Sequence, residues 1–375
     1  MSALTDTDLL VVGAGLMGSA TAWAASRRGL SVTLVEQFAA DHDRGSSHGS
    51  ARIVRRSYDD PTYTRLTGRA FELWRELELD SGTPLLRMLG GLDFGERDYV
   101  DGVAAQFRDA GVTHEILDAG EAERRWPGLR FEGPVIHHPQ AGTVDAAAAV
   151  AAFGSGAARR GAVLRFETAV VDVREVPGGV RAELSDGSAV TAGRAVVAAG
   201  AWLSDLLGGR VRLPELTVTE QEVFHFPRLD PDAPPWPSVV HEYGGGVYHL
   251  QGGRDGGPGD DRKIGVHYGG RPTRPDHRDR VVSPETRAAM VEYVSRWMPG
   301  CAPTPRGEAT CLYTSTPSED FLLDQVGALV VCSPCSGHGA KFAPLIGELT
   351  TGLVTGAGDV PERFRLAAHL GSAKG

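Results

Sequence analysis

The first part of the chain alternates between apolar runs and a segment of small residues. Residues 9–12 are an unbroken apolar run, which is typical of a parallel strand covered on both faces. Glycine-rich residues 13–18 follow directly, and alanine-rich residues 19–28 predict a helix. Residues 32–35 are again apolar and end at Glu36. This order predicts a strand–helix–strand unit.

The pattern changes several times further along the chain. An apolar stripe at helical spacing is formed by Leu66, Ala70, Trp74 and Leu77. Between residues 163 and 190, β-branched segments broken by glycine turns predict a small antiparallel layer, and residues 195–199 predict another buried strand. Serine, proline and glutamate at residues 283–285 are typical of a helix start. Residues 329–331 and 344–353 predict a last strand and a final helix.

Composition excludes several classes of protein. Of the 375 residues, 41% are hydrophobic and 23% charged, as in a folded globular protein. The net charge of −10, from 38 basic and 48 acidic residues, argues against a nucleic acid or an anionic membrane as partner. No apolar run reaches the roughly 20 residues of a spanning helix, and the N-terminus lacks the basic region of a signal peptide. Because four cysteines are too few for a disulfide framework, we expect a cytoplasmic protein.

Three glycines after the first strand have the spacing of a dinucleotide-binding turn. Gly13 allows the tight turn, Gly15 lets the backbone approach a pyrophosphate, and Gly18 lets the helix pack on the strand. The phosphates would then lie at the helix N-terminus. Glu36 follows Gly18 by 18 residues, where a carboxylate can bind the hydroxyl pair of a ribose. The pattern predicts dinucleotide binding and does not distinguish NAD from FAD; a glycine turn without a ligand is the alternative.

Several separated motifs decide between these cofactors. They are residues 13–18, 45–56, 142–145, 195–202, 263–267, 310–317 and 336–342. In this order they resemble the amine-oxidising flavoproteins of the monomeric sarcosine oxidase and N-methyltryptophan oxidase group, which belong to the D-amino-acid oxidase-like superfamily. The resemblance runs through most of the chain and implies FAD.

The resemblance also implies the architecture. It is an α/β fold in which a Rossmann-type FAD-binding domain is interleaved with an α+β substrate domain built on an antiparallel sheet. We assign residues 1–85, 140–212 and 303–375 to the discontinuous FAD-binding domain. Residues 86–139 and 213–302 form the substrate or catalytic domain.

In this family a cysteine thioether attaches FAD through its 8α-methyl carbon, and Cys311 matches that cysteine. A buried apolar cysteine is the alternative interpretation. Besides Cys311 and the three fingerprint glycines, the cofactor-binding residues that we assign are Glu36, Ser46, Arg52, Val170, Gly337, His338, Gly339 and Lys341.

The resemblance implies roles for five cations. Lys263 matches the lysine that activates oxygen, where a fixed cation stabilises superoxide; a solvated surface lysine is the alternative. Arg55 and Lys341 match the pair that holds the substrate carboxylate, for which a guanidinium and an ammonium are suited. Arg52 and His48 match residues that line the flavin face.

Other matches are less specific. His267, like His338, matches an active-site position of undefined role, and a satisfied structural histidine is the alternative. Tyr248 matches a tyrosine near the substrate, and Tyr313 is a pocket wall or a core aromatic.

Departures from the family pattern bear on the substrate. Ser47 replaces a histidine, Val266 replaces an aromatic residue, and residues 252–257 lengthen a loop, which predicts a more open or mobile pocket entrance. A bulkier secondary amine or a cyclic imino acid is therefore as compatible as sarcosine.

We therefore predict an FAD-dependent amine oxidase. It oxidises a carboxylate-bearing secondary amine or imino acid to an imine and reduces O2 to hydrogen peroxide. The alternatives are an amine dehydrogenase or biosynthetic desaturase that does not use O2, and a non-catalytic FAD-binding subunit. We expect a monomer with a small-molecule substrate and no metal, because the pair at residues 332 and 335 lacks the second pair that zinc needs.

Overall fold

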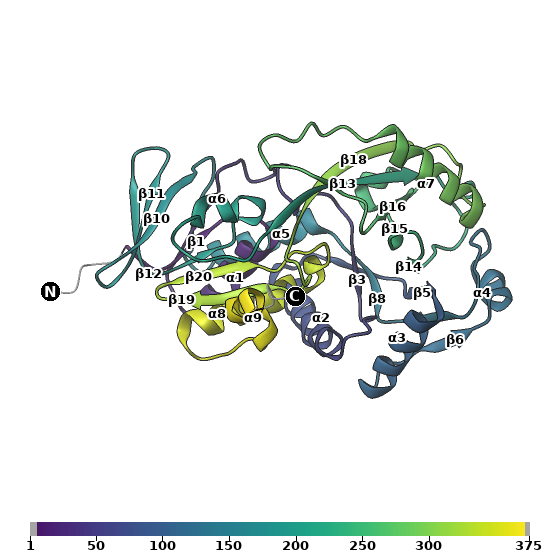
Figure 1. The fold of residues 1–375 in the computed structure, drawn as a ribbon, viewed down its shortest axis with the longest axis horizontal. Coiled ribbons are helices and arrows are strands. Elements are labelled where there is room, and N and C mark those ends of the chain that lie inside the picture. The colour runs from purple at the N-terminus through teal and green to yellow at the C-terminus, as the bar shows by residue number, and fades with distance from the viewer. Residues whose placement is uncertain (1–5, 372–375) are drawn as a thin grey trace.

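Two large sheets with a short sheet between them organise the protein (Figure 1). The computed structural model describes residues 6–371. The first sheet has eight strands in the order β10-β11-β12-β1-β2-β9, with β20 beside β12 and β19 beside β20. Its strands are β1 (Thr7–Val12), β2 (Val32–Val35), β9 (Val163–Arg165), β10 (Val170–Val176), β11 (Gly179–Leu184), β12 (Ala189–Val197), β19 (Leu322–Val326) and β20 (Leu329–Ser333).

The strand–helix–strand unit expected at the start of the chain is confirmed. β1 and β2 are parallel and flank α1 (Leu16–Arg27), whose residues are almost all buried. The helix begins earlier than the expected residue 19, because the extended Gly15 is its N-cap. Gly15 offers no side-chain cap, so the first backbone N–H groups of α1 need other partners.

Two expectations about the first sheet were wrong. Residues 163–165 form β9, which pairs parallel to β2 and lies outside the antiparallel layer. Residues 195–199 are not a separate strand, because β12 runs continuously to Val197. The first half of β12 is antiparallel to β11 and its second half is parallel to β1. An alternating or apolar pattern identifies a strand but does not identify its neighbour.

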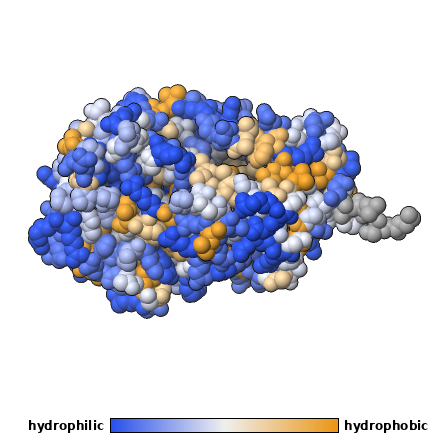
Figure 2. Space-filling view, turned by 180° about the vertical axis from the view of Figure 1, so that it is seen from behind, coloured by the Kyte–Doolittle hydropathy of each residue, from blue (hydrophilic) through white to orange (hydrophobic). Residues whose placement is uncertain are grey.

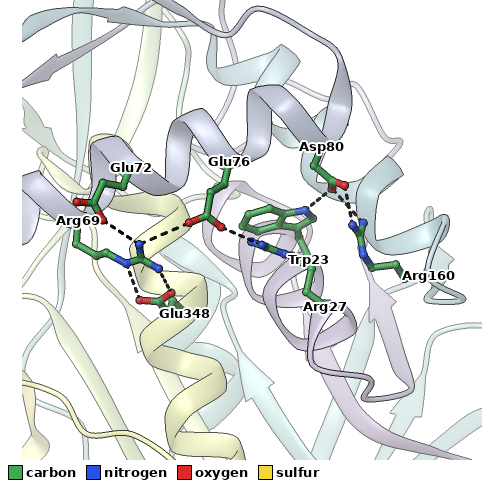
Figure 3. Close-up of polar contacts among 8 residues, drawn as sticks. All are labelled: Trp23, Arg27, Arg69, Glu72, Glu76, Asp80, Arg160 and Glu348. Carbon is green, nitrogen blue, oxygen red and sulfur yellow. Dashed lines mark hydrogen bonds and ion pairs between the residues drawn. The ribbon is translucent and has the colours of Figure 1, made fainter.

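Four helices pack against one another on the first sheet: α1, α2 (Pro61–Ser81), α5 (Ala146–Ala158) and α8 (Ala343–Thr355). The apolar stripe of α2 is confirmed, since Ala70, Trp74 and Leu77 are buried. Figure 3 shows the polar contacts at the edge of this packing, which join Arg69 to Glu72, Glu76 and Glu348, Arg27 to Glu76, and Asp80 to Trp23 and Arg160. These ion pairs are partly exposed, so each contributes at most about 1 kcal/mol and the apolar contacts supply most of the stabilisation.

The second sheet has nine strands in the order β17-β13-β16-β15-β14-β5-β7-β6, with β18 also paired to β13. All its pairs are antiparallel except β14 with β5. Its strands are β5 (Gly91–Gly95), β6 (Glu115–Leu117), β7 (Val135–His138), β13 (Thr217–Phe226), β14 (Ser238–Glu242), β15 (Val247–Gln251), β16 (Arg262–Val266), β17 (Arg271–Pro272) and β18 (Gly307–Ser315).

Helices complete the second half of the molecule and the C-terminal region. The helix expected at residue 283 is confirmed as α7, with the Ser283 hydroxyl accepting the Thr286 N–H at 3.1 Å. The helix at residues 344–353 is confirmed as α8, but it is not the last, because α9 follows it. The remaining helices are α3 (Arg97–Asp109), α4 (Ala119–Arg125), α6 (Leu203–Leu207), α7 (Pro284–Trp297) and α9 (Leu366–Gly371), with short 3-10 turns η1 (Gly200–Trp202), η2 (Gly253–Gly256), η3 (Gly339–Phe342) and η4 (Glu362–Phe364).

The short sheet lies between the two large ones. It consists of β3 (Arg52–Arg55), β8 (Ala141–Val144) and β4 (Leu86–Met88), in the order β3-β8-β4. A side chain at Gly142 would collide with the Arg87 carbonyl, so this close pairing requires glycine. The domain boundaries stay a proposal, but β18 lies in the second sheet, whereas the sequence assigns it to the FAD-binding segments.

Figure 2 shows one face, which is mostly hydrophilic and on which apolar residues gather toward the end where β10 and β11 lie in Figure 1. No helix within residues 6–371 combines the length and the apolar character needed to cross a membrane.

Candidate active site

A cavity of about 1770 Å³ is lined by residues of all three sheets. It exceeds the roughly 300–1,000 Å³ of an ordinary small-molecule pocket, so it can hold a dinucleotide together with a second ligand. The predicted site residues that line it are Gly13, Gly15, Glu36, Ser46, His48, Arg52, Arg55, Val170, Tyr248, Lys263, His267, Cys311, Tyr313, Gly337, His338, Gly339 and Lys341. Gly18 does not line the cavity. It faces the Gly13 carbonyl so closely that any side chain at this position would collide with it.

One end of the cavity has the form that a dinucleotide needs. A Cβ atom at Gly15 would lie 3.0 Å from the Ser47 hydroxyl, so glycine keeps this path narrow and open. The Ser47 hydroxyl accepts the Leu16 N–H at 3.0 Å, at the N-terminus of α1. Ser47 therefore accepts a hydrogen bond from one of the first N–H groups of α1, and the other N–H groups at this helix end can donate to a phosphate. These residues fit the pyrophosphate of FAD.

Glu36 is fixed at the end of β2. Its carboxylate accepts the Ala14 N–H at 2.7 Å and the Phe38 N–H at 3.1 Å, and it lies 3.6 Å from His42. Burial raises its pKa, but the hydrogen bonds from His42, Ala14 and Phe38 outweigh burial, so the pKa is lowered. The group is thus ionised at neutral pH, as a ligand for ribose hydroxyls must be.

The middle of the cavity holds two cations beside Cys311. Lys263 on β16 is 6% exposed, and its ammonium donates to the Ala51 carbonyl at 3.2 Å. Burial, followed by the nearby Arg52, lowers the pKa of Lys263 to about 7. The Arg52 guanidinium is immobilised by the carbonyls of Ala51, Ser46 and His48 at 2.7–3.1 Å.

The second sheet arranges the residues of this region by its register. Tyr248 pairs with Gly265, and a Cβ atom at Gly265 would lie 2.6 Å from the Tyr248 hydroxyl, so this glycine makes room for the tyrosine. On β18, Cys311 and Tyr313 are two residues apart and share one face. Cys311 is 8% exposed and is a free thiol.

Arg55 and Lys341 also line the cavity. The Arg55 guanidinium lies 4.9 Å from the centre of the Tyr58 ring, and the Lys341 ammonium donates to the Tyr58 hydroxyl at 3.0 Å. Residues from opposite ends of the chain are thereby brought to one site. Burial and the neighbouring Arg55 lower the pKa of Lys341 well below its usual range. An anion bound between the two cations would restore the charge of Lys341.

A buried acidic residue that no sequence pattern indicated holds Arg55. Asp93 is 1% exposed, lies 3.6 Å from Arg55 Nη1, and accepts the Tyr99 hydroxyl at 2.8 Å. Arg55 Nη1 also donates to Ser57 Oγ at 2.8 Å and to the Ser57 carbonyl. Asp93 and Tyr99 were missed because each is a single polar residue in an ordinary strand or helix pattern.

The histidines differ from one another. The His338 ring contacts the Tyr58 hydroxyl at 3.1 Å and the Glu319 carbonyl at 3.1 Å, so both its nitrogens are occupied. Burial lowers the pKa of His267 and of His48 to about 4, and neighbouring cations add to both effects. Both rings are therefore neutral at neutral pH, and Arg52 rather than His48 is the cation of the pair assigned to the flavin face.

The long glycine-rich loop does not form an open entrance. The Ser50 N–H donates to the Asp255 carboxylate at 2.6 Å, and the Asp255 N–H donates to Ser50 Oγ at 2.9 Å. Ser50 Oγ also donates to the Gly252 carbonyl at 3.0 Å, while Arg254 pairs with Asp145. Residues 252–257 are thus bound to the segment before β3, which the glycine content alone did not indicate.

Cys332 and Cys335 line the cavity and also contact protein groups. Cys332 lies 3.8 Å from the Thr350 hydroxyl, and burial raises its pKa to about 12. The Cys335 sulfur accepts the Thr314 N–H at 3.4 Å. Within residues 6–371, no three histidine, cysteine or acidic side chains gather as a metal site would require.

Known proteins are similar to this chain over most of its length. The family described as "FAD dependent oxidoreductase" matches residues 8–353. Monomeric sarcosine oxidase of Streptomyces avermitilis is 35% identical over 360 residues, which cover 92% of this chain and 93% of that protein. N-methyl-L-tryptophan oxidase of Yersinia pestis is 29% identical and is covered to 94%, with 92% of this chain. The structure of NikD, an unusual amino acid oxidase essential for nikkomycin biosynthesis, superimposes with a TM-score of 0.83 at 25% identity, covering 97% of this chain and 96% of that one.

Proposed function

The chain belongs to the FAD dependent oxidoreductase family, and from this premise we propose that it is an FAD-dependent amine oxidase. Its substrate is a secondary amine or imino acid that bears a carboxylate, and its product is the imine. The observation that carries the proposal is the pair Arg55 and Lys341, which lies in the same cavity as the dinucleotide turn. The similarity to sarcosine and N-methyl-L-tryptophan oxidases supports the substrate class.

We propose that Gly13, Gly15 and Glu36 bind the dinucleotide part of FAD and that Cys311 forms a thioether to its ring. Cys311 is a free thiol in the cavity wall. Its strand, β18, and the strand that carries Lys263, β16, both pair with β13. When bound, FAD accepts the hydride that the substrate C–H bond releases.

The residues of the chain bind and orient the substrate. The N–H groups of Arg55 that Ser57 and Asp93 leave free, together with the Lys341 ammonium, bind the carboxylate. The nearby cations also lower the pKa of the substrate amine, which favours the neutral form that can give up a hydride. His267, neutral and half-buried, adds no charge to the pocket.

We further propose that O2 is the electron acceptor and that Lys263 stabilises the developing superoxide, as a fixed buried cation would. The monomeric state and the cytoplasmic location also stand as proposals. If the protein is a dehydrogenase or a desaturase with another acceptor, the amount of peroxide per reoxidised flavin falls well below one equivalent.

Covalent attachment has a direct test. We expect the acid-precipitated wild-type protein to retain its yellow colour in the pellet, whereas Cys311→Ser releases the colour to the supernatant. Cys301→Ser is the control, because this buried thiol does not line the cavity. Colour in the wild-type supernatant would remove Cys311 from its assigned role.

The carboxylate site has a matched pair of variants. Arg55→Gln should raise the dissociation constant for carboxylate amines about tenfold or more, since a hydrogen bond to a charged group contributes about 1.5–3 kcal/mol. Arg56→Gln is the control, because Arg56 donates to Gln140 and Thr64 outside the cavity. Dissociation constants come from the anaerobic reduction of the flavin at varied amine concentration. If no carboxylate amine bleaches the flavin, the function proposed here is wrong.

A further inference from the structure

His225 is a cavity residue to which the proposed function gives no role. It lies on β13, is 6% exposed and lines the cavity. Its Nε2 atom has no hydrogen-bond partner in the part of the chain from residue 6 to residue 371. A buried polar atom without a partner costs free energy, so its retention in a cavity wall points to a group that binds or reacts there.

The register of the second sheet places His225 beside Lys263. The two residues are direct partners on the antiparallel strands β13 and β16. Side chains of such a pair lie on one face, with Cβ atoms about 4.5–5.5 Å apart. On the other side His225 pairs with Gly307 of β18, where a Cβ atom would lie 3.6 Å from His225 Nδ1. The imidazole therefore has Lys263 as its side-chain neighbour along the sheet.

The charges around His225 keep its ring neutral. Burial is the main cause that lowers its pKa to about 4; Lys263 lowers the pKa further, and Asp255 opposes this effect. A neutral imidazole has one N–H donor and one acceptor nitrogen. Lys263, with a pKa of about 7, is close to the point at which it gains or loses a proton near neutral pH. A proton that reaches His225 from solvent would therefore pass on to Lys263, which holds a proton more tightly than the ring does.

We propose that His225 is the proton relay of Lys263 during the reduction of oxygen, an inference that rests on the proposed function. Reduction of O2 to H2O2 needs two electrons and two protons. Reduced FAD, when bound, would supply both electrons and one proton, and the Lys263 ammonium would supply the other proton. Solvent then protonates the free nitrogen of His225, and the ring gives its other proton to the Lys263 amine, which returns the ring to its neutral form. The net change in this last step is one solvent proton gained by Lys263. His225 thus acts through Lys263 as a positioning residue.

The test uses holoenzyme whose flavin is reduced by light, so that no amine substrate is needed. Reoxidation by O2 is followed in stopped flow for the wild type, His225→Phe and His225→Gln. The matched control is His241→Gln. His241 lies on β14 of the same sheet, is fully buried and does not line the cavity, and its Nε2 has no hydrogen bond among residues 6–371, with the Glu132 carboxylate 4.0 Å away. We expect reoxidation about 100-fold slower in the His225 variants only, because positioned proton transfer contributes about that much or more.

Chemical rescue separates a relay from a structural role. Added imidazole should restore part of the lost rate in the His225 variants, whereas it should leave the wild type and His241→Gln unchanged. The proposal is overturned if the His225 variants reoxidise at the wild-type rate, if His241→Gln is slowed equally, or if imidazole restores nothing.

A second measurement keeps His225 in place and does not depend on turnover. Histidine ¹⁵N NMR of the holoenzyme gives the pKa of His225 in the wild type and in Lys263→Met. We expect the pKa to rise in Lys263→Met, because the neighbouring ammonium is gone; an unchanged pKa would overturn the pairing. If no amine reduces the flavin while light-reduced enzyme shows the His225 effect, the proposed function fails and the relay stands.

Discussion

At the residue scale, Lys263 links the chemistry to pH. Burial and Arg52 lower its pKa to about 7, so the ammonium dominates below that pH and the neutral amine above it. We therefore expect the rate constant for flavin reoxidation by O2 to fall as the pH rises through about 7. Lys263→Met should be slower at every pH and should lose this step, while anaerobic reduction of the flavin stays close to the wild-type rate. A pH step that persists in Lys263→Met would mean that another group titrates.

The positions of such cations were predictable from the sequence, but their charge states were not. The match of separated motifs to a known family predicted that Arg52, Arg55 and Lys341 lie in one site. A motif match assigns each residue to a position in the family's fold. The neutral state of His48 and the pairing of Arg55 with Asp93 depend on burial and on strands far apart in the chain. Neither leaves a local signal in the sequence.

At the scale of elements, the loop at residues 252–257 and the segment before β3 stabilise each other. Ser50 is 5% exposed and its hydroxyl both donates and accepts a hydrogen bond across this contact. Ser50→Ala should therefore lower the free energy of unfolding by about 1–3 kcal/mol. It should also speed hydrogen exchange at residues 252–261. Ser204→Ala, on the exposed face of α6, is the control, and equal exchange in both variants would contradict the contact.

Periodicity identified elements well where one face of an element is buried. It located α2 from its apolar stripe and the buried strands β1 and β20 from continuous apolar runs, whereas α7 was located from the residues at its start. It did not reveal the strands between residues 213 and 282, because buried polar side chains such as Gln221, His249 and Arg262 stand among their apolar residues and interrupt the pattern.

At the scale of the whole molecule, one cavity is lined by residues of both large sheets, so a cofactor that fills it contacts both. FAD that binds the folded state alone stabilises it by RT ln(1 + [FAD]/Kd), which is about 4 kcal/mol at a thousandfold excess over Kd. In Cys311→Ser the cofactor can leave, so its melting temperature should rise with added FAD. The wild type, with FAD attached, should show no such dependence.

The unfolding of Cys311→Ser also tests whether the regions around the two large sheets unfold together. The segments of the first sheet are separated in the chain by those of the second, and β13 and β18 connect the sides of the cavity. Cys311→Ser without FAD should therefore unfold in one transition at a lowered temperature. Tryptophan fluorescence from the two sides should change together: the first sheet has Trp23 and Trp74 nearby, and the second has Trp236 and Trp297. Variants that retain tryptophans on one side only would separate these signals. Two transitions, of which only the first responds to FAD, would mean that the cofactor stabilises one half and that the sheets fold independently.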